Sequence, residues 1–293
     1  MLDVIIALLP AVIAGVVLYG IRALLVIATC VVSAVVAEFL FNIIVKKEQT
    51  VFDLSAIVTG LILALSLHAN APVWQCIIGS VFAIIIVKCL FGGLGCNFAN
   101  PAVTARVFLL ICFSSTLAGG ARPLITSNPD LVAGATPLVQ LANGEQLPSL
   151  LDMLFGCRGG SIGESCIVAL LIGFVYLVAR KVINFEVPLI MIATVFVLAF
   201  VVSGDINVAL YHVLGGGLVF GAVFMATDYV TSPITRTGKM IFAFGCGLIT
   251  FLIRMYGNYP EGVSFAILFM NILSPYIENW TKPRALGKRG KKA

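Results

Sequence analysis

The chain has 293 residues, of which 60% are hydrophobic and 11% are charged, and its formal net charge is +5. An average soluble domain has roughly 25% charged residues, so this composition excludes a water-soluble fold. The basic residues gather at the C-terminus and do not follow a face that could track a phosphate backbone. We therefore expect membrane lipid around the chain and no nucleic acid as a partner.

Ten apolar runs of near-bilayer length predict an all-α integral membrane protein. Several are shorter than the roughly 20 residues that a straight crossing needs. Gly and Pro at their ends indicate broken or tilted helices that face protein or a cavity. The runs are Leu2–Tyr19, Ala23–Val45, Val51–Leu67, Val73–Leu90, Pro101–Leu117, Ile162–Ala179, Val187–Val202, Val208–Ala226, Met240–Tyr256 and Val263–Ile277.

The runs group into two five-helix halves, residues 1–117 and 162–278, joined by a connection at 118–161 and followed by a basic tail at 279–293. If the N-terminus is cytoplasmic, most Lys and Arg also fall on the cytoplasmic side. The positive-inside rule then predicts a multi-pass protein of a prokaryotic cell membrane, with both termini cytoplasmic and the connection outside. The four basic residues left outside are Arg22, Arg122, Arg158 and Arg254.

The two halves echo each other in sequence. Gly92–Gly95 precedes Asn97–Arg106, and Gly215–Gly217 precedes Asp228–Arg236; both read as glycines, polar residues, proline, threonine and arginine. Since each half has an odd number of spans, a true repeat must be inverted across the membrane, an architecture that forms sites at the repeat interface. Strict alternation puts both echoed segments on the cytoplasmic side, which fits an inverted repeat only if one of them is matched out of register.

The connection at 118–161 is longer than ordered loops without a function usually are. Its segment Asn128–Leu138 contains Asn-Pro, a glycine and a second proline, which on local chemistry alone is ordinary turn punctuation. Asp130, however, is followed six residues later by the threonine of Gly134-Ala135-Thr136. This arrangement resembles the site at which a flavinyl transferase attaches FMN to threonine through a phosphoester.

The surrounding sequence resembles the D subunit of Rnf complexes, the ion-translocating ferredoxin:NAD oxidoreductases. This family is related to the B subunit of the sodium-translocating NADH:quinone oxidoreductase. The resemblance covers essentially the whole chain and includes Asp53–Gly60, Asn97–Arg106 and Ala226–Pro233. It implies covalent FMN at Thr136, within a recognition segment formed by Asp130, Gly134, Ala135 and Pro137.

The resemblance also implies a function. The chain would relay electrons through the covalent FMN between ferredoxin-side and NAD-side subunits, coupled to Na⁺ or H⁺ export. Its implied partners are other membrane subunits, an outer-side peripheral subunit with FMN, and cytoplasmic iron–sulfur and NAD-binding subunits. With no Rossmann glycine fingerprint, the chain has no complete active site and no catalytic residue of its own. Its eight Cys form no Cys-x-x-Cys pair, so we expect no metal site held by this chain alone.

A second flavin, non-covalent riboflavin, is expected near the cytoplasmic side. One flavin near the outer surface cannot reach a cytoplasmic acceptor across roughly 30 Å of hydrocarbon. The echoed segments supply amide, carboxylate and hydroxyl partners there. The alternative is that these side chains are helix caps in a packed core. The candidate residues are Asn97, Asn100, Arg106, Asp228, Thr231 and Arg236.

Two alternatives stay open on sequence grounds. Glu38, Asp53 and Asp205 lie near predicted span ends, where solvation at the interface explains them as well as a function does. A channel or secondary transporter for a small polar solute is the rival function, because an inverted repeat with glycine-broken helices is equally a transporter design. A covalent flavin distinguishes the two functions, since a transporter has no use for one.

Overall fold

The computed structural model describes residues 1–117, 119–124, 136–144, 147–257 and 261–282, which are helical apart from connections and one isolated β-bridge. Two short stretches, η2 and η3, are π-helical, and η1 is a 3₁₀-helix. The first half contains α1 (Leu2–Tyr19), α2 (Ile21–Val45), η1 (Val51–Asp53), α3 (Ser55–Ser66), α4 (Val73–Val81), η2 (Phe82–Cys89), α5 (Pro101–Cys112) and α6 (Ser114–Leu117). The connection and the second half contain α7 (Pro137–Asn143), α8 (Leu150–Phe155), α9 (Ile167–Ala179), α10 (Glu186–Ser203), α11 (Ile206–Leu214), α12 (Leu218–Phe220), η3 (Gly221–Met225), α13 (Arg236–Tyr256) and α14 (Val263–Thr281).

Within these described residues, four helices are long and apolar enough to cross a membrane: α1, α2, α10 and α13. A fifth candidate consists of α11 followed by α12 and η3, which meet at an angle of 58°. Shorter apolar helices, namely α3, α4 with η2, α5 and α9, stand beside them. The all-α membrane class is therefore confirmed to the extent of four or five membrane-length spans. The arrangement of about ten spans in two halves stays a prediction.

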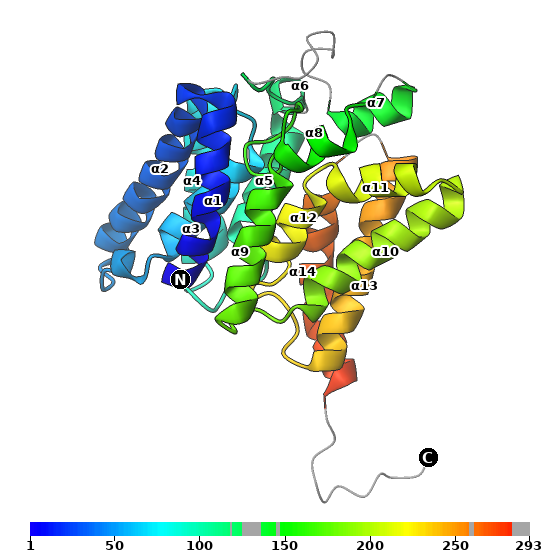
Figure 1. Ribbon diagram of the computed structural model, residues 1–293. Helices are drawn as coiled ribbons and strands as arrows, with labels where there is room; N and C mark the ends of the chain where they lie inside the picture. Colours follow the sequence, from blue (N-terminus) through cyan, green and yellow to red (C-terminus); the bar gives the residue numbers. More distant parts are fainter. Residues whose placement is uncertain (118, 125–135, 145–146, 258–260, 283–293) are drawn as a thin grey trace, which may run out of the picture.

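Different segments of the chain lie at the two ends of the molecule (Figure 1). The N-terminus lies at the lower end of this view, where α14 also finishes, while α6, α7 and α8 lie at the upper end. We call the lower end the N-terminal face and the upper end the loop face. The two predicted halves, residues 1–117 and 162–278, touch where α1 packs against α9 and where α5 packs against α14.

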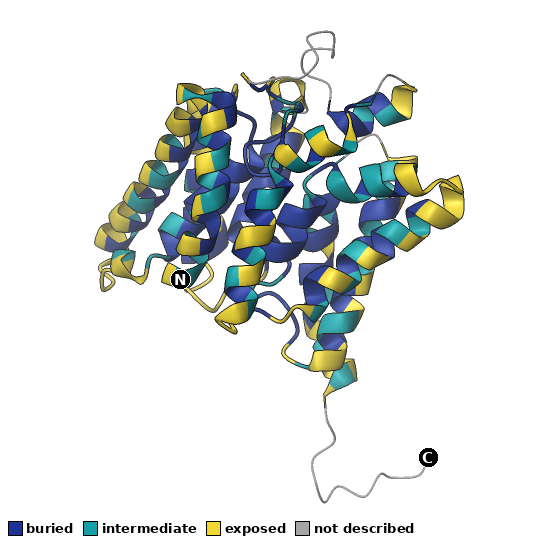
Figure 2. Cartoon of the chain, in the orientation of Figure 1, coloured by how far each residue is buried: buried dark blue, intermediate teal, exposed yellow. Residues whose placement is uncertain are grey.

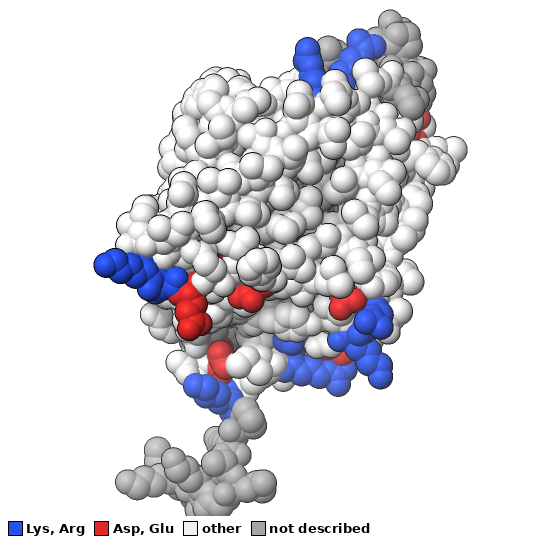
Figure 3. Space-filling model, turned by 90° about the vertical axis from the view of Figure 1, so that its left-hand side faces the viewer, with Lys and Arg blue, Asp and Glu red and all other residues white. Residues whose placement is uncertain are grey.

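The surface has the distribution expected for a protein in lipid. Buried residues fill the centre, and exposed residues lie on the outward sides of the peripheral helices (Figure 2). On α2 the exposed residues Val32, Val36, Phe39 and Ile43 form one apolar stripe at helical spacing. Charged side chains gather toward the two ends and leave the middle of the visible face without charge (Figure 3). An apolar belt between two charged ends is what a bilayer requires.

Glycines break the bent span between α11 and α12. Gly216 and Gly217 have φ values of 62° and 66°, in the left-handed region that favours glycine. The break frees the carbonyl oxygens of Gly215 and Gly216, and Arg254 Nη2 donates to both at 3.1 Å. The freed backbone groups are therefore bound by protein, as lipid requires.

The sequence echo does not mark structurally equivalent segments. The cluster Gly92–Gly95 directly precedes Asn97 at the N-terminal face. The triplet Gly215–Gly217, in contrast, lies inside the bent span, and α12 and η3 separate it from Asp228. The match fails because the triplet breaks a helix, whereas the first cluster connects two helices.

Candidate functional site

Thr136 lies at the loop face, immediately before α7. It occupies the N-cap position with extended backbone, and Pro137 follows as the first residue of the helix. Its side chain is 1% exposed, and its hydroxyl makes no hydrogen bond to any residue that the structure describes. The other three residues of the expected recognition segment, Asp130, Gly134 and Ala135, lie outside the described residues.

The helix that follows Thr136 rests on the glycine break. Leu138 is 4% exposed, and its side chain lies against Gly215 and Gly216. A Cβ atom on Gly215 would lie 3.1 Å from Leu138 Cγ, and one on Gly216 would overlap Leu138 Cδ1. The absence of side chains on Gly215 and Gly216 therefore lets α7 approach the bent span closely. This packing brings Thr136 near the residues that bind the freed carbonyl oxygens.

A cavity of about 200 Å³ opens at the N-terminal face, and we call it the N-terminal cavity. It lies between α3, η2 and the start of α5 in the first half and η3 with the following connection in the second half. Apolar side chains from α1, α3, α9 and η3 form most of its wall. Its polar lining includes Ser55, Thr59, Lys88, Asn97, Asn100 and Asp228.

Three of the six residues predicted for the second flavin line this cavity. Asn100 also caps α5, because its Oδ1 accepts hydrogen bonds from Ala102 N at 3.1 Å and Val103 N at 3.4 Å. Asn97 Oδ1 is buried without a hydrogen-bond partner among the described residues. Asp228 accepts from Val230 N and from the Thr231 hydroxyl, and burial raises the pKa of its carboxyl group. Thr231 therefore acts on the cavity only through Asp228.

The remaining two predicted residues, Arg106 and Arg236, do not line the cavity. Arg106 lies farther along α5, where its Nη2 contacts Glu261 Oε2 at 3.0 Å. Arg236 lies at the surface with its side chain 75% exposed and pairs with Glu186. Each guanidinium is held by a carboxylate of a distant segment, and sequence spacing gives no sign of that pairing.

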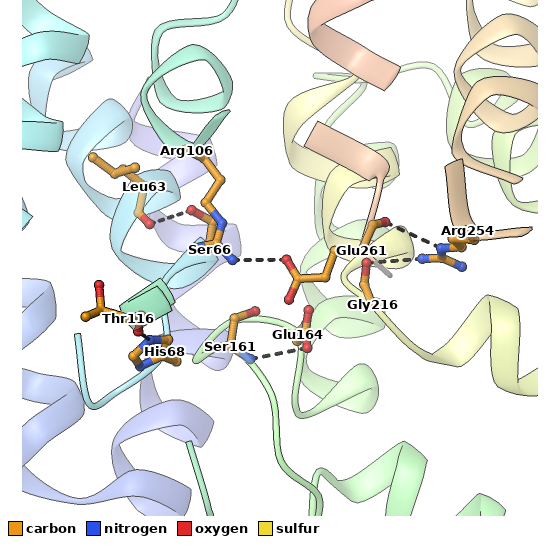
Figure 4. Close-up of polar contacts among 10 residues, drawn as sticks. All are labelled: Leu63, Ser66, His68, Arg106, Thr116, Ser161, Glu164, Gly216, Arg254 and Glu261. Atoms are coloured by element: carbon orange, nitrogen blue, oxygen red, sulfur yellow. Dashed lines mark hydrogen bonds and ion pairs between the residues drawn. The ribbon is translucent and has the colours of Figure 1, made fainter. Parts of the chain in front are cut away.

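A second polar region, which we call the central polar cluster, consists of Arg106, Arg158, Glu164, Arg254 and Glu261. In Figure 4, Arg106 and Glu261 point toward each other, and Arg254 approaches from the far side of Glu261. Glu164 Oε1 accepts from Ser161 N at 3.2 Å, and Arg158 Nη2 donates to the carbonyl oxygens of Glu164 and Leu214. A small void of about 20 Å³, enough for one water molecule, is lined by Arg106, Glu164 and Glu261 of this cluster.

The sequence analysis missed this cluster. The count of basic residues assigned Arg158 and Arg254 to outer connections and Arg106 to the cytoplasmic side. In the structure Arg106 and Arg158 are buried and Arg254 is half-buried. The available signal was the presence of arginines inside or beside apolar runs, since charges at membrane depth almost always face a partner.

A buried ion pair adjoins the N-terminal cavity. Lys88 Nζ lies 2.8 Å from Glu38 Oε1 and donates to the Ser55 hydroxyl at 2.6 Å. Glu38 is 1% exposed, so interfacial solvation does not explain it. Asp53 and Asp205, in contrast, are exposed, as solvation at the membrane interface requires. Asp205 also caps α11.

Comparison with known proteins decides the family. The family model described as the NQR2, RnfD, RnfE family matches residues 1–287. The chain belongs to the NQR2/RnfD/RnfE family. It is 47% identical to the D subunit of the Na⁺-translocating ferredoxin:NAD⁺ oxidoreductase complex of Acetobacterium woodii, an alignment that covers 98% of this chain and 90% of the relative. The resemblance noted from the sequence is thereby confirmed.

Two further relatives are similar to this NQR2/RnfD/RnfE chain over nearly all of their length. The D subunit of the proton-translocating ferredoxin:NAD⁺ oxidoreductase complex of Clostridium ljungdahlii is 40% identical, over 99% of this chain and 91% of the relative. The D subunit of the ion-translocating oxidoreductase complex of Stutzerimonas stutzeri is 39% identical, over 99% and 93%. The family match includes Thr136, the N-terminal cavity and the central polar cluster alike.

Proposed function

We propose that this chain is the D subunit of an Rnf-type ion-translocating ferredoxin:NAD oxidoreductase, a membrane flavoprotein that relays electrons between its partner subunits. The observation that carries the proposal is the full-length match to D subunits that are named for this activity. The chain contributes one subunit of the enzyme and no complete active site. Its relatives are named for both Na⁺ and H⁺ translocation, so the exported ion is either of these.

FMN attached to Thr136 through a phosphoester is the first cofactor of the proposal. When bound, a flavin supplies one- and two-electron transfer. The buried hydroxyl, which has no hydrogen-bond partner among the described residues, fits an oxygen whose function is to carry another group. Because Thr136 is 1% exposed, a transferase can reach that hydroxyl only after the atoms that cover it move aside.

Ten crossings with cytoplasmic termini are the proposed topology. In Figure 1 the described ends of the chain lie at the same face, as an even number of crossings requires. The N-terminal face would be cytoplasmic and the loop face extracytoplasmic in a prokaryotic cell membrane. Thr136 would then hold its FMN outside, near the partner subunit that carries FMN on that side.

Non-covalent riboflavin in the N-terminal cavity is the second cofactor of the proposal. The lining is mostly apolar with a few polar groups, the usual character of a site for a small organic ligand. Asn97 Oδ1, buried without a partner among the described residues, can accept a hydrogen bond from the ring or the ribityl chain. Asn100 would act chiefly through the cap that it provides for α5. Cytoplasmic iron–sulfur and NAD-binding subunits would exchange electrons with this face.

The deciding experiment is the mass of the intact chain, produced together with a flavinyl transferase. We expect the wild-type chain to carry FMN less one water and to fluoresce after denaturation, because a phosphoester survives unfolding. Thr136→Ala should abolish both signals. Thr116→Ala is the matched control, since Thr116 is another loop-face threonine whose hydroxyl already bonds Gln75.

Two outcomes would reject parts of the proposal. Fluorescence that persists in Thr136→Ala would move the attachment site elsewhere. A wild-type chain of unmodified mass would favour the channel or transporter, because only the electron relay requires a flavin.

A further inference from the structure

A chain of hydrogen bonds runs from the surface of the N-terminal face into the N-terminal cavity. The Asn42 side-chain amide donates to Thr50 Oγ1 at 3.1 Å, and the Thr50 hydroxyl donates to Glu38 Oε1 at 2.6 Å. The same carboxylate oxygen accepts from Lys88 Nζ at 2.8 Å, and Lys88 donates to Ser55 Oγ at 2.6 Å. Each group in this path is joined to the next by a direct hydrogen bond.

The two ends of this path lie in different environments. Thr50 is an exposed residue at the N-terminal face, and the hydrogen bonds of its hydroxyl are half-buried. Glu38 and Lys88 are 1% and 2% exposed, so the middle of the path is dry. Lys88 and Ser55 both line the N-terminal cavity. The path therefore connects water at the N-terminal face with any ligand in the cavity.

The Glu38–Lys88 ion pair leaves one oxygen atom of the Glu38 carboxylate unused. Glu38 Oε2 is buried and has no hydrogen-bond partner among the described residues, so one carboxylate oxygen stays free to take a proton. A buried ion pair is weak evidence for stability, because desolvation offsets most of its attraction. Lys88 also lies on the π-helical stretch η2, a type of irregularity that is frequent at functional sites.

We infer that Thr50, Glu38 and Lys88 form a proton-delivery path to the electron acceptor in the N-terminal cavity, which rests on the riboflavin proposed there. Lys88 Nζ would donate one proton, with that N–H bond breaking, to an acceptor that takes up one electron from a partner carrier. Glu38, protonated from surface water at Thr50, returns a proton to Lys88. The sum is one electron and one bulk proton added to the acceptor, with both side chains restored.

Other ionisable groups face the path and set its electrostatic environment. On the Glu38 side, Cys89 of η2 lies close to Glu38, Lys88 and Lys47. On the cavity side, the lining contributes the groups of Met1, Asp228 and Tyr229. Among the ionisable groups that the structure describes here, Lys88 and Glu38 alone join the surface to the cavity through hydrogen bonds.

The test measures proton uptake directly in the purified complex. A light pulse reduces the flavins through a photosensitised donor, and a pH-indicator dye follows the protons taken from solution. Acid-released riboflavin is quantified in every sample. Glu38→Gln keeps the shape but cannot carry a proton, and it should slow uptake roughly 100-fold, the lower end of what a positioned proton donor contributes.

Thr50→Val removes the entry hydroxyl, together with its hydrogen bond from Asn42, and should slow uptake several-fold even if Glu38→Gln fails to assemble. Ser33→Ala is the matched control on α2, because the Ser33 hydroxyl bonds only the backbone oxygens of Thr29 and Cys30. It should leave uptake unchanged. Unchanged uptake in Thr50→Val and Glu38→Gln at full riboflavin content would overturn the path and leave the flavin proposal standing. A wild-type complex that releases no riboflavin would overturn both.

Discussion

Arg106 and Glu261 join the two halves of the molecule: Arg106 Nη2 of α5 lies 3.0 Å from Glu261 Oε2, just before α14. The guanidinium is 2% exposed, and its Nη1 has no partner among the described residues, so the single carboxylate provides its main compensation. Arg254 holds the backbone oxygen of the same Glu261 at 3.4 Å and the freed oxygens of the glycine break. An ion pair and arginine–carbonyl hydrogen bonds therefore link α5, the start of α14 and the glycine break within the shared apolar core.

Glu261→Gln should destabilise the protein by leaving Arg106 buried without a counter-charge. Because the Glu261 side chain is 23% exposed, we expect a loss of about 2 kcal/mol in the free energy of unfolding, below the full value for a buried pair. Arg106→Met combined with Glu261→Gln should recover much of that loss. Unfolding in detergent micelles measures both, and simple addition of the single effects would contradict the pairing. Arg236→Met, which breaks the exposed pair with Glu186, should change stability little.

Gly60→Ala should weaken the packing of α3 against α2. A Cβ atom at position 60 would lie 2.9 Å from the Cys30 oxygen and 2.9 Å from Val31 Cα, and backbone atoms cannot move aside easily. We expect a loss of roughly 1–3 kcal/mol, as for other overpacked sites. Gly245→Ala is the control, because its Cβ would meet the flexible end of Met270. Equal melting temperatures for the two variants would show that α2 and α3 separate more readily than the structure indicates.

Asp228→Asn should change how stability depends on pH. Burial raises the pKa of the Asp228 carboxyl above its unfolded value, near 3.9. The folded state therefore binds more protons, and wild-type stability falls as pH rises from the unfolded pKa through the raised folded pKa. Asparagine cannot ionise, so the variant should lack this fall and gain relative to wild type toward neutral pH. Thermal unfolding measured from pH 4 to 8 tests the difference; parallel curves would mean that Asp228 ionises freely.

Reporter fusions at Ala142 and at the C-terminus should lie on opposite sides of the membrane. Ala142 belongs to α7 at the loop face, whereas α14 ends at the N-terminal face. With cytoplasmic termini, a periplasmic phosphatase reporter should be active only at Ala142. Activity at the C-terminus instead would invert the orientation and place Thr136 on the cytoplasmic side.

The sequence predicted local features better than partnerships. Asn100-Pro101 and the glycine triplet signal a helix start and a helix break, because capping and backbone freedom depend on neighbouring residues. The membrane class followed from composition alone. Asn97, Asn100 and Asp228 line one cavity, and each flanks a helix end at one face.

Partners that lie far apart along the chain could not be predicted. Arg106 was assigned to the second flavin, yet its carboxylate partner is 155 residues away. Glu38 and Lys88 are 50 residues apart and lie on helices whose relative rotation depends on packing. A single sequence shows that such charges need partners but does not show which ones.

The π-helical stretch fixes the angular phase of Lys88. Each residue of an α-helix turns the chain by about 100°, so the irregular turns of η2 determine which way the last side chains of this span point. If the same number of residues wound as a regular α-helix, Lys88 would point in a different direction, away from Glu38. An apolar helix facing lipid tolerates many changes of side chain, but here it cannot tolerate a change of winding.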